Sequence, residues 1–241
     1  MLEIALAGLA VVAGAIAAVA GFGIGSVLTP ALAFSVGTKV AVVLVALPHL
    51  AATTYRLWLL RRDVDRQVLL SFGLASAAGG LVGAILHGLF SSPWLAAVLG
   101  ALLVFAGLSE LIGLARRLVL RGWAATAAGA LSGLFGGLVG NQGGIRSAAL
   151  LRFTLSGRAI VATSTATGVM VDVARVPIYL ATGWADIAAN WPLVLFLIAA
   201  VLAGTVAGAP LLRRLPEVTF RRVLAMLLIA LGVLLIVGIR V

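Results

Sequence analysis

The chain of 241 residues contains no cysteine and few acidic or imidazole side chains. Without cysteine there can be no disulfide, no thiolate metal ligand and no cysteine nucleophile. The seven aspartates and glutamates and the two histidines are spread along the whole chain, too thinly to form a cluster of metal ligands. We therefore expect no metal site and no cofactor, and the sequence carries no nucleotide-binding motif.

Hydrophobic residues, in contrast, make up 63% of the chain and charged residues only 10%. With a mean hydropathy of +1.24, a water-soluble fold could not cover its surface with polar groups. Apolar runs of about 20 residues recur along the length, as in helical membrane spans and unlike the weak alternating segments of a barrel. The sequence predicts an all-α integral membrane protein that lies in a lipid bilayer.

The formal charge of +10 could suggest a nucleic-acid partner. The arginines, however, fall in short clusters between apolar runs, which is the pattern of cytoplasmic loops in membrane proteins. We therefore expect no nucleic-acid binding. The N-terminus lacks the positive region and the cleavage site of a signal peptide, so we interpret it as the first helix.

The chain is expected to consist of two repeats, residues 1–115 and 116–241. Two glycine-rich stretches align when Gly25 is placed on Gly143, and three later glycines recur at one constant spacing: Gly79, Gly83 and Gly107 as Gly204, Gly208 and Gly232. Each repeat is predicted to contain a helix hairpin with a glycine-rich break, followed by three spans. The hairpins are 2–36 and 122–155, and the spans are 38–60, 68–87 and 93–115, then 159–182, 192–212 and 223–239.

We call residues 21–25 the first break and residues 140–144 the second break. The segment 26–36 that follows the first break would reach about 16 Å, roughly half of a membrane core. If both short segments turn back, all the arginine clusters face the cytoplasm, both termini face outside, and the halves are inverted repeats. The clusters are Arg61, Arg62 and Arg66; Arg116, Arg117 and Arg121; Arg152 and Arg158; and Arg213, Arg214, Arg221 and Arg222. The alternative is a bundle of eight spans with kinked helices, which puts some of the clusters on the wrong side.

In the hairpin arrangement the short helices would begin at Ser26 and Gly144, near the middle of the membrane. Each helix N-terminus presents unpaired N–H groups and roughly half a positive charge, and glycine lets the backbone approach a ligand. We therefore predict a site for a small anionic substrate where the two breaks meet. The candidate binding residues are Gly23, Gly25, Ser26, Thr29, Asn141, Gln142, Gly143, Gly144, Arg146 and Ser147.

Arg146 is the most informative of these residues, because an arginine at mid-membrane costs about 2.5 to 3.5 kcal/mol and needs a partner. The partner is either the substrate or Asp172. A planar guanidinium with five donors suits two oxygens of a sulfonate, sulfite or carboxylate group.

His49, Asp172 and Arg175 are candidates for proton coupling or gating, since they lie inside predicted spans. Asp172 and Arg175 stand three residues apart and can also simply pair with each other, and His49 can be a packing residue. Arg56 is expected to anchor the cytoplasmic end of its helix rather than to line a path.

The paired motifs resemble a known family. Residues 21–32 (GFGIGSVLTPAL), 140–151 (GNQGGIRSAALL) and 208–216 (GAPLLRRLP) are similar to the TauE/SafE sulfite exporter family, and the resemblance extends over nearly the whole chain. It implies a bacterial inner-membrane permease for sulfur-containing anions such as sulfite, sulfoacetate or other organosulfonates. Ser26 replaces a glycine of the family pattern, and Ala148 stands where a proline is expected. These departures, together with Arg146, indicate a different substrate within the family.

The expected function is a secondary transporter, an exporter of a small anion by alternating access, and not an enzyme. An anion channel is the nearest alternative. An intramembrane hydrolase, with His49 as the base for Ser26, is an alternative of another class. The sequence leaves a homodimer open.

Overall fold

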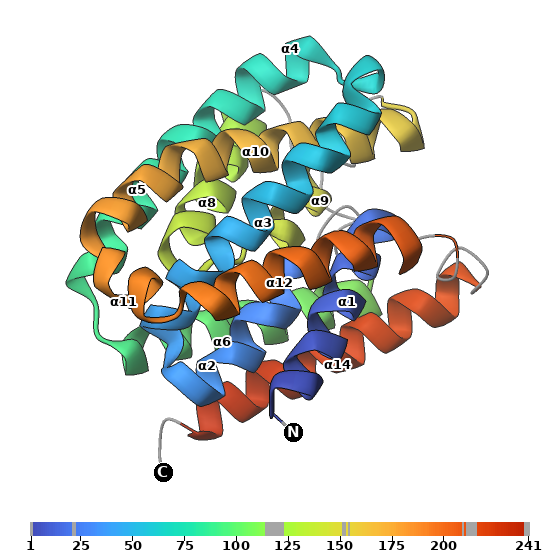
Figure 1. Ribbon diagram of the computed structural model, residues 1–241. Helices are drawn as coiled ribbons and strands as arrows, with labels where there is room; N and C mark the ends of the chain where they lie inside the picture. Colours follow the sequence, from blue (N-terminus) through green and yellow to red (C-terminus); the bar gives the residue numbers. More distant parts are fainter. Residues whose placement is uncertain are drawn as a thin grey trace.

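The computed structural model describes residues 2–20, 23–113, 123–150, 153, 155–208, 210 and 216–238 (Figure 1). Within these ranges the side chains of residues 2–7, 20, 147, 148, 208 and 217 are not described. The described chain is helical apart from short turns, so the predicted all-α class is confirmed. The predicted cytoplasmic arginines at positions 116, 117, 121, 152, 213 and 214 lie outside the described residues.

Helices of the first half follow one another with short connections. They are α1 (Leu2–Ala20), η1 (Ile24–Leu28), α2 (Thr29–Val36), α3 (Thr38–Leu60), η2 (Arg61–Asp63), α4 (Arg66–Val68), η3 (Leu69–Gly73), α5 (Leu74–Leu89) and α6 (Ser92–Leu111). Those of the second half are α8 (Trp123–Val139), α9 (Gly143–Leu150), α10 (Gly157–Thr182), α11 (Trp184–Ala189), α12 (Trp191–Ala203), η4 (Gly204–Gly208) and α14 (Glu217–Gly238).

Five stretches of the described chain are long and apolar enough to cross a membrane. They are Thr38–Asp63, Arg66–Leu89, Ser92–Leu111, Gly157–Thr182 and Val218–Gly238. The sixth predicted span, 192–212, is represented by a shorter apolar helix, Trp191–Ala207. Length and composition thus make this a multi-pass membrane protein.

Three predicted boundaries differ from the structure. The first short helix begins at Ile24 as a π-helical turn, so Ser26 lies inside the helix and not at its start. The predicted turn 184–191 contains the short helix α11. The basic loop ends at Pro216, because proline is tolerated at a helix start, and Arg221 and Arg222 therefore belong to α14.

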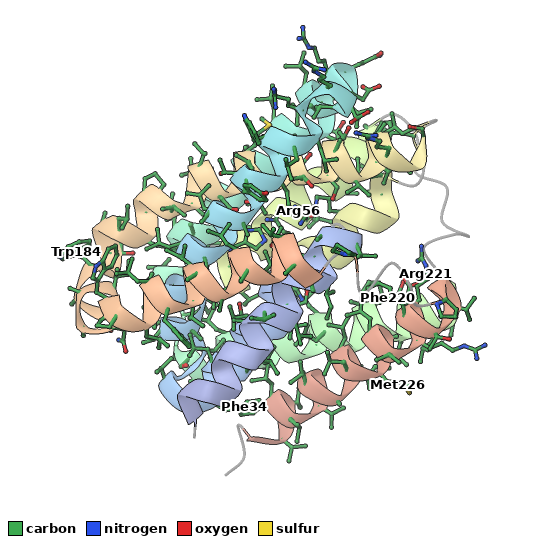
Figure 2. All side chains as sticks on the ribbon, turned by 45° about the vertical axis from the view of Figure 1, so that its right-hand side comes forward. Phe34, Arg56, Trp184, Phe220, Arg221 and Met226 are labelled. Carbon is green, nitrogen blue, oxygen red and sulfur yellow. The ribbon has the colours of Figure 1, made fainter. Side chains whose placement is uncertain are left out.

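The two ends of α3 meet different parts of the chain. At its beginning, Lys39 Nζ donates hydrogen bonds to the carbonyls of Gly88 and Phe90, in the turn between α5 and α6. Past its other end, Asp63 accepts a hydrogen bond from Arg158 Nε at 2.8 Å. Trp184 and Arg221 also lie at opposite sides of the molecule (Figure 2). The described arginines of the predicted cytoplasmic clusters thus lie away from the uncharged turn 88–93.

The second break turns the chain around. Phe72 of η3 lies against Gly129 of α8, and the ring of Phe153, which follows α9, packs edge-on against the same phenylalanine with 6.4 Å between centroids. Because both segments reach one residue, the chain after the break runs back beside α8. In the first half, the turn at Gly23 packs against Ile16 of α1, and α1 also contacts α2.

Close backbone contacts of the two halves correspond. A Cβ on Gly79 of α5 would lie 2.0 Å from the carbonyl oxygen of Ala130 in α8. A Cβ on Gly204 of η4 would lie 1.9 Å from the carbonyl oxygen of Val11 in α1. The second span of one half thus rests on the first helix of the other half in both cases, at glycines that the sequence alignment had paired.

The contacts where α6 crosses α14 also correspond between the two halves. Gly107 of α6 contacts the carbonyl of Ala225, and Gly232 of α14 contacts the carbonyl of Gly100. Exchanging the two halves converts one contact into the other, because Gly107 aligns with Gly232 and Gly100 with Ala225. A contact and its exchanged partner at one crossing are what a two-fold axis through that crossing produces.

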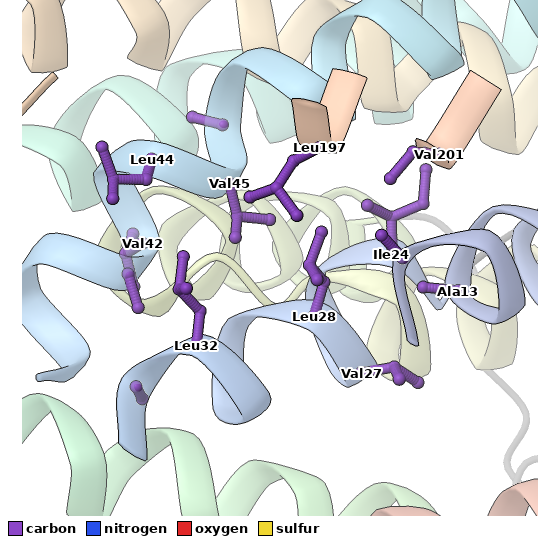
Figure 3. Packing of buried hydrophobic residues seen from close by; sticks show 14 of the residues in the cluster. Ala13, Ile24, Val27, Leu28, Leu32, Val42, Leu44, Val45, Leu197 and Val201 are labelled. Atoms are coloured by element: carbon purple, nitrogen blue, oxygen red, sulfur yellow. The ribbon is translucent and has the colours of Figure 1, made fainter. Parts of the chain in front are cut away.

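The apolar core surrounds the first break and its short helix. Leu28 and Leu32, which are fully buried, pack towards Val42 and Val45 of α3 and Leu197 of α12 (Figure 3). At about 25 cal/mol per Å² of buried apolar surface, this packing fixes the helix that carries the break within the middle of the molecule. Its polar residues are thereby held among other buried groups.

Candidate anion site

The two breaks touch each other. A Cβ on Gly25 would lie 2.1 Å from the carbonyl oxygen of Gly140, so only glycine permits this approach. Gly140 has a φ of 73°, which ends α8 in the left-handed conformation. Next to this contact the Ser26 hydroxyl donates a hydrogen bond to Asn141 Oδ1 at 3.0 Å. The predicted meeting of the breaks is therefore present in the structure.

A pocket lies at this meeting point. Its lining contains seven of the ten predicted binding residues, together with His49 and Gly140: Gly23, Gly25, Ser26, Asn141, Gln142, Gly143 and Arg146.

Of the other three predicted binding residues, two are described, and neither is in this lining. Gly144 borders a neighbouring pocket and packs on Ala106 of α6. Thr29 is fully buried near Gly140, and its hydroxyl has no hydrogen-bond partner among the described residues. The side chain of Ser147 is not among the described side chains.

Both short helices begin at the pocket. α9 starts at Gly143, and the continuous helix formed by η1 and α2 starts at Ile24 after a turn at Gly23 with φ 135°. The first N–H groups of each helix have no acceptor within the helix, and the helix dipole adds partial positive charge there. The backbone therefore makes the pocket attractive to an anion.

Arg146 adds a full charge to the same place. Its side chain is 2% exposed, and its Nε donates a hydrogen bond to Ser164 Oγ of α10 at 2.9 Å. A Cβ on Gly168, one turn further along α10, would lie 3.0 Å from Arg146 Nη1. Ser164 and Gly168 thus fix the position of the guanidinium.

Asp172 is held by residues other than Arg146. Its Oδ2 lies 2.6 Å from His49 Nδ1 and accepts a hydrogen bond from Thr53 at 3.1 Å. Its Oδ1 accepts hydrogen bonds from Arg175 Nε at 2.9 Å and Nη2 at 2.8 Å. The pairing of Asp172 with Arg175 that the spacing allowed is present, and His49 joins it. The bridge from Asp172 to Arg146, the other expected pairing, is replaced by these contacts.

Three side chains cap the end of α8. Arg175 Nη1 donates to the carbonyl of Gly136 at 2.5 Å, the Tyr179 hydroxyl donates to the carbonyl of Gly137, and His87 Nδ1 donates to the carbonyl of Leu138 at 2.8 Å. The last carbonyls of a helix receive no hydrogen bond from an N–H group of the same helix, so they need donors from outside it. These side chains therefore anchor the second break. Sequence reasoning missed two of them, Tyr179 and His87.

The buried charges are unbalanced. Among the described side chains, the fully ionised groups that are buried are Arg56, Arg146 and Arg175 against the single carboxylate of Asp172. A buried charge is costly unless an opposite charge compensates it. In addition, Gln142 is 4% exposed, and in the part of the chain that the structure describes neither polar atom of its amide has a hydrogen-bond partner. The pocket therefore has positive charge and an uncommitted amide to offer to an anion.

The hydrolase alternative can be compared with this geometry. Ser26 and His49 share the pocket, and His49 is paired with Asp172, which is the order of a Ser-His-Asp triad. The Ser26 hydroxyl, however, donates its hydrogen bond to Asn141, whereas a nucleophilic serine donates to its histidine. The arrangement favours binding over attack by this hydroxyl.

Arg56 was expected at the cytoplasmic surface, and this expectation is wrong. Its side chain is 4% exposed and its Nη2 donates a hydrogen bond to Thr165 Oγ1 at 2.9 Å. The residue lies among the helices in the middle of the molecule (Figure 2). The hydroxyl-rich run Thr163-Ser164-Thr165-Ala166-Thr167, inside an otherwise apolar span, is the sequence signal that could have indicated a polar interior there.

These features define a class of protein: a multi-pass helical membrane protein with a buried, positively charged pocket between two helix breaks. The family model for the sulfite exporter TauE/SafE matches residues 6–235, so the chain belongs to the TauE/SafE family. This confirms the resemblance found in the motifs. Searches of curated protein sequences and of solved structures gave no match.

Proposed function

We propose that this protein is a secondary transporter of a small oxyanion, sulfite or a short organosulfonate, and that the anion binds in the pocket between the two breaks. The observation that carries the proposal is the convergence of several positive or hydrogen-bonding groups on this pocket. Arg146, two helix N-termini and the amide of Gln142 converge on it. A guanidinium matches two oxygens of a sulfur oxyanion in one plane.

Alternating access follows from the correspondence between the halves. Gly79 and Gly204 make equivalent contacts in the two halves, and so do Gly107 and Gly232. These equivalent contacts support two repeats related by a two-fold axis. Since each half has an odd number of crossings in the predicted tracing, this axis lies in the membrane plane and the repeats are inverted. Movement of one half against the other then opens the central pocket to either side in turn. The arginine-rich side is the cytoplasm of a bacterial inner membrane, and both termini face outside.

Proton coupling is assigned to His49 and Asp172. His49 lines the pocket and contacts Asp172 directly, so a change of protonation at this pair alters the charge that faces the anion. With Nδ1 engaged by Asp172, Nε2 is the nitrogen that can exchange a proton with the pocket. Export of an anion together with a proton would thereby respond to a pH gradient.

The test of the site is binding of sulfite, sulfate, methanesulfonate and acetate to the purified protein, followed by ligand-induced thermal stabilisation. We expect stabilisation by at least one sulfur oxyanion. Arg146→Gln should weaken its binding by about tenfold or more, which corresponds to the loss of about 1.4 kcal/mol or more. Arg222→Gln, at an exposed position of α14, is the matched control and should leave binding unchanged. Native affinity in a folded Arg146→Gln protein would contradict the proposal.

Transport itself distinguishes a carrier from an anion channel. Proteoliposomes loaded with unlabelled sulfite should accumulate labelled sulfite by counterflow, because a carrier exchanges one bound ion for another. The initial rate should saturate with sulfite concentration. A flux without counterflow that rises linearly with concentration would favour the channel.

A further inference from the structure

A polar seam joins α3 and α10 across the middle of the molecule. On α3 its members are His49, Thr53 and Arg56, which lie on one helix face because they are spaced four and three residues apart. His49 and Thr53 contact Asp172 of α10, and Arg56 contacts Thr165. The seam begins at the pocket, which His49 lines, and leads towards the end of α3 where Asp63 and Arg158 pair.

Arg56 is the unusual member of this seam. Its guanidinium is 4% exposed, and within the described structure its hydrogen-bond partner is the neutral hydroxyl of Thr165, with no carboxylate in ion-pair distance. A guanidinium has five donors, so one hydroxyl leaves most of its hydrogen-bonding capacity unused. A buried cation in this state is costly, which indicates that an anion compensates it for part of the transport cycle.

The position of Arg56 relative to the pocket is defined by α10. Arg146 donates to Ser164 and Arg56 donates to Thr165, so consecutive residues of α10 hold the two guanidinium groups. Arg146 belongs to the pocket, whereas Arg56 lies one turn before the end of α3. Arg56 is therefore the next positive group on the way from the pocket to the arginine-rich end.

We propose that Arg56 and the Thr165 hydroxyl form a second binding station for the transported oxyanion, between the pocket and the arginine-rich side. This inference rests on the proposed function and adds a site to it. An anion leaving Arg146 moves to Arg56 before it reaches water, and two stations of moderate affinity allow faster release than one tight site. The neutral Thr165 hydroxyl suits this role, since it holds the guanidinium in place without competing as an anion.

The test separates binding at the pocket from passage along the seam. Sulfite binding to the purified protein is measured by isothermal titration, and sulfite counterflow is measured in proteoliposomes. The variants are Arg56→Gln, Arg56→Lys and Thr165→Val. Arg62→Gln, at an exposed position just past the end of α3, is the matched control.

We expect wild-type protein and Arg62→Gln to bind two sulfite ions, one more weakly than the other. Arg56→Gln should lose the weaker phase, keep the tighter affinity within about threefold and lower the counterflow rate by about tenfold or more. Arg56→Lys, which keeps the charge, should restore part of the rate. Thr165→Val should lower the rate less than Arg56→Gln, because the guanidinium remains.

Three results would overturn the second station. The first is a single binding phase in the wild type together with an unchanged counterflow rate in Arg56→Gln. The second is an equal loss of both binding phases in Arg56→Gln and Thr165→Val. The third is a loss of folding in Arg56→Gln alone, with Arg56→Lys and Thr165→Val folded and transporting at the wild-type rate. If the wild type binds no sulfur oxyanion, the proposed function itself fails, and this outcome differs from all three.

Discussion

His49 Nδ1 lies 2.6 Å from Asp172 Oδ2, and the two residues come from equivalent helices of the two halves. The pair is buried and lies directly beside the pocket, since His49 lines it. Asp172 also holds Arg175, whose guanidinium caps α8 just before the second break. A proton on this pair therefore affects the pocket and the anchoring of the break together.

The first prediction concerns proton coupling at this pair. Asp172→Asn and His49→Gln should abolish acceleration of sulfite transport by a pH gradient. Sulfite exchange without a gradient should continue, because the proposed site binds the anion through Arg146 and the helix ends. Glu110→Gln is the control, since Glu110 pairs with Arg221 in a partly exposed bridge at 2.7 Å. Unchanged dependence on the pH gradient in both variants would exclude this pair as the coupling site.

The second prediction concerns membrane topology. The chain has no native cysteine, so single cysteines report their side without background. Ser91→Cys and Ala185→Cys should react with a membrane-impermeant maleimide from outside, and Arg62→Cys and Arg222→Cys only after the membrane is opened. All four positions are exposed. Equal labelling of Ala185→Cys and Arg222→Cys in intact cells would show that the second half is traced wrongly.

The third prediction concerns the cap of α8. Tyr179→Phe removes the hydroxyl that donates to the carbonyl of Gly137 and leaves that buried oxygen without this donor. The free energy of unfolding should fall by about 1 to 3 kcal/mol. Tyr55→Phe is the matched control at a partly exposed position and should change stability little. Thermal unfolding in detergent compares the two, and equal melting temperatures would indicate that the cap is dispensable.

The fourth prediction uses the correspondence of the halves. Gly79→Ala and Gly204→Ala each place a Cβ against a backbone carbonyl of a neighbouring helix, at 2.0 and 1.9 Å. Backbone cannot move aside as a flexible side chain does, so each variant should lose about 1 to 3 kcal/mol of stability. Gly88→Ala, with open space around its Cβ, should be nearly neutral. A large difference between Gly79→Ala and Gly204→Ala would argue against equivalent packing in the two halves.

The chain's family and its membrane character could be predicted from the sequence because they depend on local patterns. Apolar runs long enough to span a membrane indicate that the helices lie in lipid, and the glycine-rich motifs of both halves indicate the family. The helix boundaries of the spans 38–60 and 159–182 also agree closely with α3 and α10, since their ends are marked by glycine and by charge.

Most of the candidate site was predictable for the same reason. Amide and arginine side chains are costly inside a membrane, so their presence in and next to a glycine-rich break already indicated a polar centre. What the motif could not indicate is that Thr29 is not among the residues that line the pocket, or that Gly144 lines a neighbouring one.

Other features depend on contacts between distant segments and could be decided only by the tertiary structure. Arg56 stands two helical turns after His49 and five residues before Arg61, a place that suits a surface anchor equally well. It is interior because α10 packs on that face of α3 and presents Thr165 to it. In the same way Asp172 had two candidate partners in the sequence, Arg146 and Arg175. The pairing with Arg175 and the addition of His49 follow from the distances set by helix packing. Sequence determines which polar groups enter the membrane, because their cost is local, whereas the packing of the helices determines which of them meet.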